Sequence, residues 1–238
     1  MHEKENSLAT KLAQYGSLLA LVHVVAGCSA DAPQQQSTLR EENAAASVVP
    51  AKDTKLVVAF GDSLFAGYGL AQDQGFAPAL ERALSAGGVK AQVFNAGVSG
   101  DTSAAGLQRL SFVLDGLARK PDLVIVGLGG NDMLRGLSPE ATRANLDAIL
   151  SELDKRGVRT MLTGMLAAPN LGADYAAAFN RIYPELARKH GATLYPFFLD
   201  GVVGRRDLLL PDGIHPNDRG VDVVVSHVAP QVSGALDE

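Results

Sequence analysis

The chain has 238 residues, of which 47% are hydrophobic and 20% charged, enough for one sizeable hydrophobic core. Its 25 Gly and 11 Pro residues lie below the level of low-complexity sequences, so a wholly disordered, collagen-like or coiled-coil protein is excluded. The net charge of -5 and the lack of a basic run argue against a nucleic-acid partner. The single cysteine, Cys28, excludes an intrachain disulfide and a cysteine-based zinc cluster.

The first 27 residues have the pattern of a signal peptide. Lys11 precedes an apolar stretch of 15 residues, Leu12 to Ala26, which is too short to span a bilayer but has signal-peptide length. The stretch ends in Val25-Ala26-Gly27-Cys28, which resembles the bacterial lipoprotein cleavage box, where small residues precede a cysteine that receives a diacylglyceryl group. We therefore predict a signal peptide at 1–27 and lipidation of Cys28. The alternative is a buried N-terminal helix with an incidental cysteine.

Residues 28–53 are predicted to be a flexible tether. From Ser29 to Lys52 the sequence shows no sustained apolar period and too little hydrophobicity to pack. A domain at 54–235 would then be anchored through Cys28 at a bacterial cell envelope and face the periplasm. Ser29, rather than Asp, follows the cysteine, and this favours the outer membrane in a Gram-negative host.

From Lys55 onward, short apolar runs alternate with segments of helical periodicity, as in successive βαβ units. The runs are almost continuously apolar, which is typical of strands buried on both faces of a parallel sheet. We therefore predict an α/β fold with three layers, α/β/α, around a five-stranded parallel sheet. The predicted strands are Leu56–Phe60, Ala91–Asn95, Leu123–Leu128, Arg159–Gly164 and Thr193–Tyr195.

Five helices are predicted between and after these strands. A helix from Tyr175 to His190 should be kinked at Pro184, and a last helix should run from about Asn217 to Val232. The other three are indicated by leucines, with Phe76 and Ile149, at helical spacing: Phe76, Leu80 and Leu84; Leu107, Leu110, Leu114 and Leu117; and Leu146, Ile149, Leu150 and Leu153, this third helix opening at Ser138-Pro139-Glu140.

Glycine-rich polar segments follow the first three strands. In open parallel sheets ligands bind outside the carboxyl ends of the strands, so these segments are where chemistry is expected. They are Gly61-Asp62-Ser63-Leu64, Asn95-Ala96-Gly97-Val98-Ser99-Gly100-Asp101 and Gly129-Gly130-Asn131-Asp132, and near the C-terminus stands Asp212-Gly213-Ile214-His215-Pro216.

In order and spacing, these four blocks resemble those of the SGNH (GDSL-motif) hydrolases, whose sheet is flavodoxin-like, over residues 55 to about 232. FGDSLFAGYGL, NAGVSGDTS, LGGNDMLRG and DGIHPN are most similar to the bacterial branch of secreted thioesterases, arylesterases and lysophospholipases. The resemblance implies that Ser63 is the nucleophile, His215 the base and Asp212 its orienting partner. It also implies an oxyanion hole formed by Ser63, Gly100 and Asn131.

The residue types themselves suit this chemistry. A serine hydroxyl is a weak nucleophile unless a neighbouring base takes its proton, and histidine can do so near neutral pH. A third group must hold the imidazole in one tautomer, and Asp212 could reach it through a turn at Gly213. Taken singly, each residue also has a structural explanation: Ser63 as a helix cap, Gly100 as a turn glycine, and Asn131 as a turn residue. Asp62 and Asp132 are expected to shape loops rather than react.

We therefore predict a serine ester hydrolase that needs no cofactor or metal and acts on small acyl or aryl esters or lysophospholipids. The chain lacks a G-x-S-x-G elbow, a P-loop and an H-E-x-x-H motif. Two alternatives stay open: a carbohydrate O-deacetylase of the same family, and a non-catalytic envelope lipoprotein that binds a ligand. The absence of Trp argues weakly against a sugar groove. An apolar trough is predicted from Leu64, Phe65, Met133, Leu134, Leu166 and Leu171.

Overall fold

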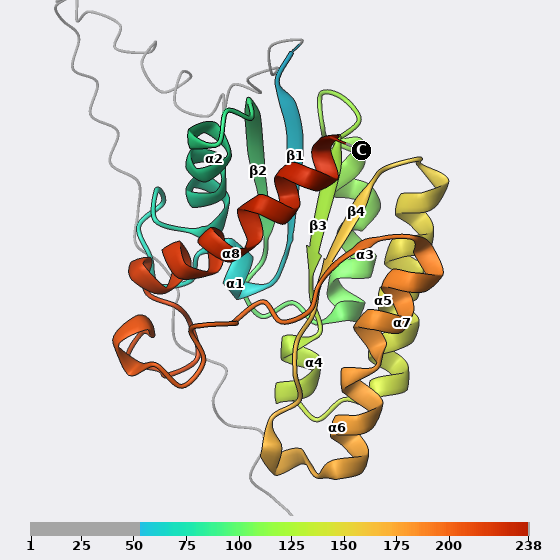
Figure 1. Cartoon of the computed structure of the whole chain (residues 1–238). Helices are drawn as coiled ribbons and strands as arrows, with labels where there is room; N and C mark the ends of the chain where they lie inside the picture. Colours follow the sequence, from blue (N-terminus) through green and yellow to red (C-terminus); the bar gives the residue numbers. More distant parts are fainter. Residues whose placement is uncertain (1–52, 238) are drawn as a thin grey trace, which may run out of the picture. The chain divides into compact units, whose positions relative to one another are not determined.

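A five-stranded parallel sheet forms the centre of the computed structural model, which describes residues 53–237 (Figure 1). The strand order is β2-β1-β3-β4-β5, so β2 lies on one side of β1 and the three later strands lie on the other. The predicted signal peptide, Cys28 and all of the tether except Asp53 lie outside the described residues. The strands are β1 (Lys55–Gly61), β2 (Ala91–Gly97), β3 (Leu123–Gly127), β4 (Thr160–Thr163) and β5 (Thr193–Tyr195).

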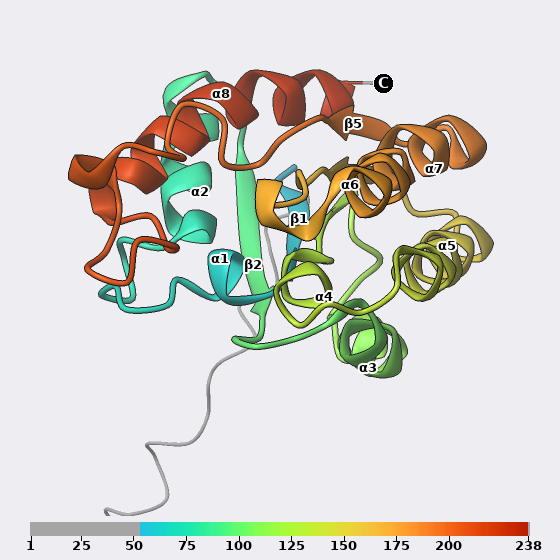
Figure 2. The same ribbon diagram turned by 90° about the horizontal axis from the view of Figure 1, so that it is seen from below.

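Alternate residues of the strands contribute to two separate cores, because successive side chains of a strand point to opposite faces. Val57 and Ala59 of β1 pack with α2 and α8, whereas Val58 and Phe60 pack with α3, α5 and α7. Figures 1 and 2 show these helices as layers on the two sides of the sheet. The predicted three-layer α/β/α fold is confirmed. The helices are α1 (Ser63–Ala66), α2 (Phe76–Ala86), α3 (Ser103–Asp115), α4 (Gly130–Leu134), α5 (Pro139–Lys155), α6 (Ala173–Asn180), α7 (Ile182–His190) and α8 (Asp218–Asp237), with short 3-10 turns at Pro169–Leu171 and Arg206–Leu208.

Helix α5 begins where its sequence signals predict. The hydroxyl of Ser138 accepts a hydrogen bond from the Ala141 N–H at 3.1 Å, and Pro139 occupies the first helical position. Helix α3 ends at Asp115, so Leu117 lies beyond it. None of the helices in residues 53–237 combines the length and hydropathy that crossing a bilayer requires.

The prediction of one kinked helix from Tyr175 to His190 is wrong. The segment forms two helices, α6 and α7, which are separated at Arg181. Pro184 lies in the first turn of α7, where a backbone N–H would have no acceptor within the helix. The proline therefore starts a new helix instead of bending a continuous one.

The last helix is longer than predicted. It begins after Asn217, whose side-chain oxygen accepts a hydrogen bond from the Gly220 N–H at 2.9 Å, and it continues past Val232 to Asp237. Pro230 lies inside it. The side chains of Val224, Val228 and Val232 are fully or almost fully buried, so packing against the sheet outweighs the hydrogen bond that the proline removes.

The ends of three strands meet at one edge of the sheet. Gly61 is in register with Gly97 of β2 and with Gly127 of β3. Because β2 and β3 lie on opposite sides of β1, the chain connections diverge at this edge, which is where ligands bind in open α/β sheets. Figure 2 looks toward this edge and shows α1 and α4, which follow β1 and β3.

Candidate active site

Ser63 is the first residue of α1, a single helical turn that follows directly on β1. The carboxylate of Asp62 caps this turn by accepting a hydrogen bond from the Leu64 N–H at 3.0 Å. The turn ends at Gly67, whose φ of 80° is the left-handed conformation that favours glycine. A short, capped turn therefore presents the serine hydroxyl at the carboxyl edge of the sheet.

Helix α1 sits unusually close to the strand ends because three of them finish in glycine. A Cβ atom on Gly61 would lie 2.5 Å from the Phe65 ring, and one on Gly127 would overlap the same ring. A Cβ on Gly97 would overlap the backbone at Phe65 and Ala66. These three glycines and the buried Phe65 form what we call the glycine socket, which fixes the position of the turn that carries Ser63.

Ser63, His215 and Asp212, the residues that the family resemblance pointed to, form a hydrogen-bonded chain. His215 Nε2 lies 2.8 Å from Ser63 Oγ, and His215 Nδ1 lies 2.7 Å from Asp212 Oδ2. The other carboxylate oxygen of Asp212 accepts hydrogen bonds from the backbone N–H groups of Ile214 and His215 at 2.9 and 3.1 Å. The arrangement is that of a nucleophile, a base and a group that orients the base.

The hydrogen bonds to Asp212 determine the tautomer of His215. The Ile214 N–H, the His215 ring and the His215 N–H, in that order, lower the pKa of Asp212 to about 2. The carboxylate is therefore ionised at neutral pH and can only accept hydrogen bonds. Nδ1 of a neutral His215 must carry the proton, which leaves the lone pair of Nε2 directed at Ser63.

Tyr68 covers one face of His215, a contact that the sequence analysis missed. The two ring centroids are 4.5 Å apart, and Tyr68 is 51% exposed at the edge of the cleft. Its place in FGDSLFAGYGL, five residues after Ser63, was the only available signal.

The three predicted oxyanion donors line the same cleft. Gly100 lies in a turn with a φ of 86°, and its carbonyl accepts a hydrogen bond from Arg135 Nη2 at 2.8 Å. Among the hydrogen bonds within residues 53–237, none is donated by the backbone N–H of Ser63 or of Gly100. Both groups can therefore donate to a ligand.

Asn131 is the second residue of α4, and its amide orientation is fixed by its partners. Nδ2 donates a hydrogen bond to the backbone carbonyl of Asp101 at 2.9 Å and lies 3.5 Å from Asp62 Oδ2. The second N–H of this amide has only the 3.5 Å contact with Asp62, so this N–H is available to donate a hydrogen bond to an oxyanion.

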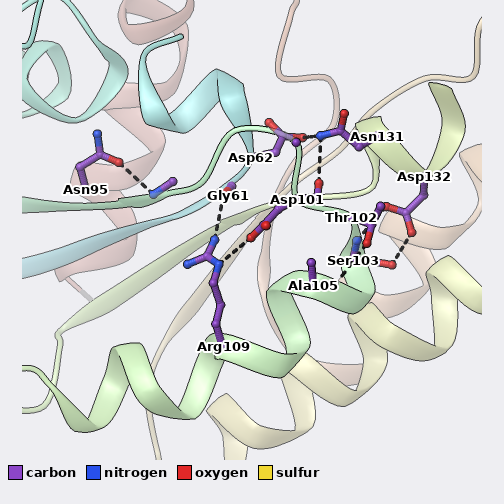
Figure 3. Close-up of polar contacts among 12 residues, drawn as sticks. Gly61, Asp62, Asn95, Asp101, Thr102, Ser103, Ala105, Arg109, Asn131 and Asp132 are labelled. Carbon is purple, nitrogen blue, oxygen red and sulfur yellow. Dashed lines mark hydrogen bonds and ion pairs between the residues drawn. The ribbon is translucent and has the colours of Figure 1, made fainter. Parts of the chain in front are cut away.

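Asp62 and Asp132 accept hydrogen bonds that fix the loops around the site. Asp132 accepts hydrogen bonds from the Ser103 N–H at 2.8 Å and from the Ser103 hydroxyl, and it thereby ties α4 to the start of α3 (Figure 3). Asp62 is only 4% exposed, and burial raises its pKa to about 6 against the opposing effects of the Leu64 N–H and of His215. A nearly buried carboxyl group that titrates near pH 6 thus lies beside Ser63.

The cleft above Ser63 has a volume of about 380 Å³ and is largely apolar. Of the predicted trough residues, Leu64, Met133 and Leu134 line it, but Phe65, Leu166 and Leu171 do not. Phe65 is buried in the glycine socket, and Leu171 packs against the core. Five further apolar or aromatic side chains line the cleft and were not predicted: Tyr68, Met165, Leu199, Val203 and Ile214.

The remaining histidines of the described region have other partners. His190 lies between the carboxylates of Asp147 and Asp154, and His227 lies 3.6 Å from Asp200. Within residues 53–237, no three His, Cys, Asp or Glu side chains are grouped so that they could hold a metal ion.

Several known proteins are similar to this chain in sequence and in fold. Residues 59–223 match the family described as GDSL-like Lipase/Acylhydrolase. Esterase TesA of Pseudomonas aeruginosa is 42% identical over 166 residues, which cover 70% of this chain and 81% of that protein. Thioesterase 1/protease 1/lysophospholipase L1 of Escherichia coli K12 is 36% identical over 182 residues, 76% of this chain and 84% of that protein.

A solved structure agrees with these relatives. The crystal structure of AlinE4, described as an SGNH-hydrolase family esterase, is 53% identical, with a TM-score of 0.67 over 78% of this chain and 98% of that one. The fold and the Ser-His-Asp arrangement define a serine hydrolase of the α/β class. The chain belongs to the GDSL-like lipase/acylhydrolase family, and it is a carboxylic ester hydrolase.

Proposed function

We propose that the protein hydrolyses small acyl and aryl esters through an acyl-enzyme intermediate on Ser63. Ser63 Oγ attacks the ester carbonyl carbon while His215 Nε2 accepts its proton, and the tetrahedral intermediate then expels the alcohol or phenol, protonated by the same nitrogen. Water, activated by His215, releases the acid and restores Ser63. The observation that carries this proposal is the continuous chain from Ser63 Oγ through His215 to Asp212, with distances of 2.8 and 2.7 Å.

The oxyanion is stabilised by the N–H groups of Ser63 and Gly100 and by the side-chain amide of Asn131. Donors of this kind favour the transition state because they point at charge that develops only during the reaction. The free backbone N–H groups and the longer contact between Asn131 and Asp62 support this assignment. Because none of the three donors carries a charge, none can form an ion pair that would hold it away from the substrate.

The acyl or aryl group occupies the apolar cleft. Met133 and Met165 line it with flexible side chains, and Leu134, Val203 and Ile214 line it where they are exposed to solvent. Each methylene of a substrate that is buried there contributes about 0.8 kcal/mol. The relatives named esterase, thioesterase and lysophospholipase accord with substrates that join a polar leaving group to an apolar acyl chain.

Two measurements test this function. A fluorophosphonate should label Ser63 in the wild type and should not label the Ser63→Ala variant, whereas a non-catalytic binding protein would show no labelling of either. Across p-nitrophenyl esters from acetyl to palmitoyl, kcat/KM should rise from acetyl to medium chains because the cleft is apolar. A steady fall from acetyl, together with activity on acetylated xylan, would instead identify a carbohydrate O-deacetylase.

The proposed location is the bacterial cell envelope, with the domain anchored through a lipid on Cys28 and facing the periplasm. The cleavage-box pattern before Cys28 supports this, and Cys28 lies outside the described residues. Within the described residues, Asp53 precedes the amino end of β1, whereas the cleft lies at the carboxyl end of the sheet. Cys28→Ser should abolish fatty-acid labelling and membrane association while esterase activity persists, and unchanged association would contradict the anchor.

A further inference from the structure

The side chain of Arg109 contacts two segments of the active site, the end of β1 and the loop before α3. Its Nε lies 2.6 Å from Asp101 Oδ2, and its Nη2 donates a hydrogen bond to the carbonyl oxygen of Gly61 at 3.0 Å (Figure 3). The Arg109 side chain is 19% exposed and that of Asp101 only 12%. The guanidinium also lies 4.2 Å from the centre of the Phe60 ring. These three contacts hold the partly buried guanidinium in one orientation.

Both partners of Arg109 are directly linked to proposed catalytic groups. Gly61 is separated from Ser63 only by Asp62, and its carbonyl also accepts the Val98 N–H from the loop that contains Gly100. The backbone carbonyl of Asp101 accepts the hydrogen bond from Asn131 Nδ2 at 2.9 Å. One guanidinium therefore connects the end of β1 before the nucleophile to the peptide that fixes the Asn131 amide.

We propose that Arg109 is a positioning residue of the oxyanion hole, which sets the Asn131 amide relative to Ser63 through Asp101. This inference rests on the proposed catalytic roles of Ser63 and Asn131. Removing the guanidinium would leave the Asp101 carboxylate buried without its partner, and the loop would move to hydrate it. A displacement of about 1 Å in a group that contacts the reacting atoms can lower the rate on the order of 10²-fold.

A lysine cannot replace this arginine fully. Its ammonium group is a single point charge, so it can pair with Asp101 but cannot also keep the hydrogen bond to the Gly61 carbonyl and the contact with the Phe60 ring. The expected activities therefore fall in the order wild type, Arg109→Lys, Arg109→Met.

The test is a double-mutant cycle of Arg109→Met and Asn131→Ala, with kcat and KM measured on a p-nitrophenyl ester well below the unfolding temperature of every variant. Arg109→Met should lower kcat about 10-fold or more with little change in KM, and Asn131→Ala about 10²- to 10³-fold. If Arg109 acts through Asn131, Arg109→Met should change kcat less than about twofold in the Asn131→Ala background.

A matched control separates positioning from stability. Arg156 also binds two acidic side chains, Asp115 and Glu152, at the far ends of α3 and α5. Arg156→Met should lower the melting temperature without lowering kcat, and a merely structural Arg109 would behave in the same way.

Each other outcome has one interpretation. Losses that multiply in the double variant, or an unchanged kcat for Arg109→Met, would overturn the inference while the proposed function stands. An Asn131→Ala variant with full kcat would instead remove the proposed oxyanion role itself. If Arg109→Met does not fold, Arg109→Lys takes its place in the same cycle with the same criteria.

Discussion

The carboxylate of Asp212 binds both the backbone and the ring of His215. One oxygen accepts the His215 N–H at 3.1 Å, and the other lies 2.7 Å from Nδ1 of the same residue. Because a single side chain binds the peptide and the imidazole together, a local turn contributes to the orientation of the base. This explains why the two residues can stand only three positions apart in the sequence.

Asp212→Asn should therefore lower kcat about 10³- to 10⁴-fold while the fold is retained. The amide oxygen of asparagine can still accept the N–H groups of Ile214 and His215, but its NH₂ group would face Nδ1. The imidazole proton would then move to Nε2, and the lone pair needed by Ser63 would be lost. Steady-state kinetics and circular dichroism would test this, and a loss of less than tenfold would contradict the tautomer argument.

Ser63→Ala and His215→Ala should each remove nearly all esterase activity, and the double variant should be no worse than either one. The two residues form one proton-transfer unit, so the second substitution removes nothing that the first has left. Measurements of initial rates on the three variants would show this. An active Ser63→Ala enzyme would contradict the assignment of the nucleophile.

Asp62→Asn should stabilise the protein at pH 8 by on the order of 2 to 3 kcal/mol, because burial raises the pKa of Asp62 from 3.8 to about 6. A raised carboxyl pKa means that the folded state binds the proton more tightly, so the destabilisation is present above pH 6 and is relieved as the pH falls toward 4. The asparagine oxygen can keep the cap on the Leu64 N–H. Denaturant unfolding at several pH values would measure the difference.

The control for this prediction is Asp222→Asn, which alters an exposed carboxylate on α8. In the wild type, the unfolding free energy should decline as the pH rises from 4 to 6. Asp222→Asn should show the same decline, whereas Asp62→Asn should not. If the stability of the wild type instead rises from pH 4 to pH 6, and Asp62→Asn shows the same slope, the raised pKa of Asp62 is contradicted.

His190→Gln should destabilise the protein most at acidic pH. Burial lowers the pKa of His190, but hydrogen bonds to Asp147 and Asp154 outweigh it and raise the pKa above its usual 6.5. A raised histidine pKa gives stability that is fully present below pH 6.5 and is lost as the pH rises through the folded-state value. The difference in melting temperature between wild type and variant should therefore shrink from pH 6 to pH 9.

His227→Gln is the matched variant, since His227 is more exposed and lies 3.6 Å from a single carboxylate, Asp200. It should change the melting temperature little at any pH. A His190→Gln difference that stayed constant with pH would show that the contact is packing and not charge.

Periodicity predicted the strands, and the resemblance of four blocks to the SGNH hydrolases implied the residues of this site, but neither predicted the contacts around them. The five strands were recognisable because buried parallel strands are continuously apolar. The rule that ligands bind at the carboxyl ends of strands drew attention to the segments of Ser63 and Asn131. The role of His215, which follows no strand, came only from the resemblance of the four blocks to the family. The break at Arg181 was missed because a proline in the first turn of a helix and one inside a helix look alike in sequence.

Side-chain direction was the other source of error. Leu64 and Phe65 are neighbours in a single turn, and no periodicity separates the one that lines the cleft from the one that fills the glycine socket. The role of Arg109 was equally hidden, because its partners Gly61 and Asp101 are 48 and 8 residues away and meet only when β1 and the loop before α3 are assembled.

The glycine socket makes the tolerance of this protein to substitution uneven. Any side chain at Gly61, Gly97 or Gly127 would collide with the turn that carries Ser63, so even alanine is excluded there by volume. Leu134, Val203 and Ile214 stand at the open rim, where a change of size displaces only solvent or substrate. Substitutions of the side chains along the cleft wall can therefore change which esters the protein accepts. Substitutions at the three glycines beneath the nucleophile are excluded by lack of space.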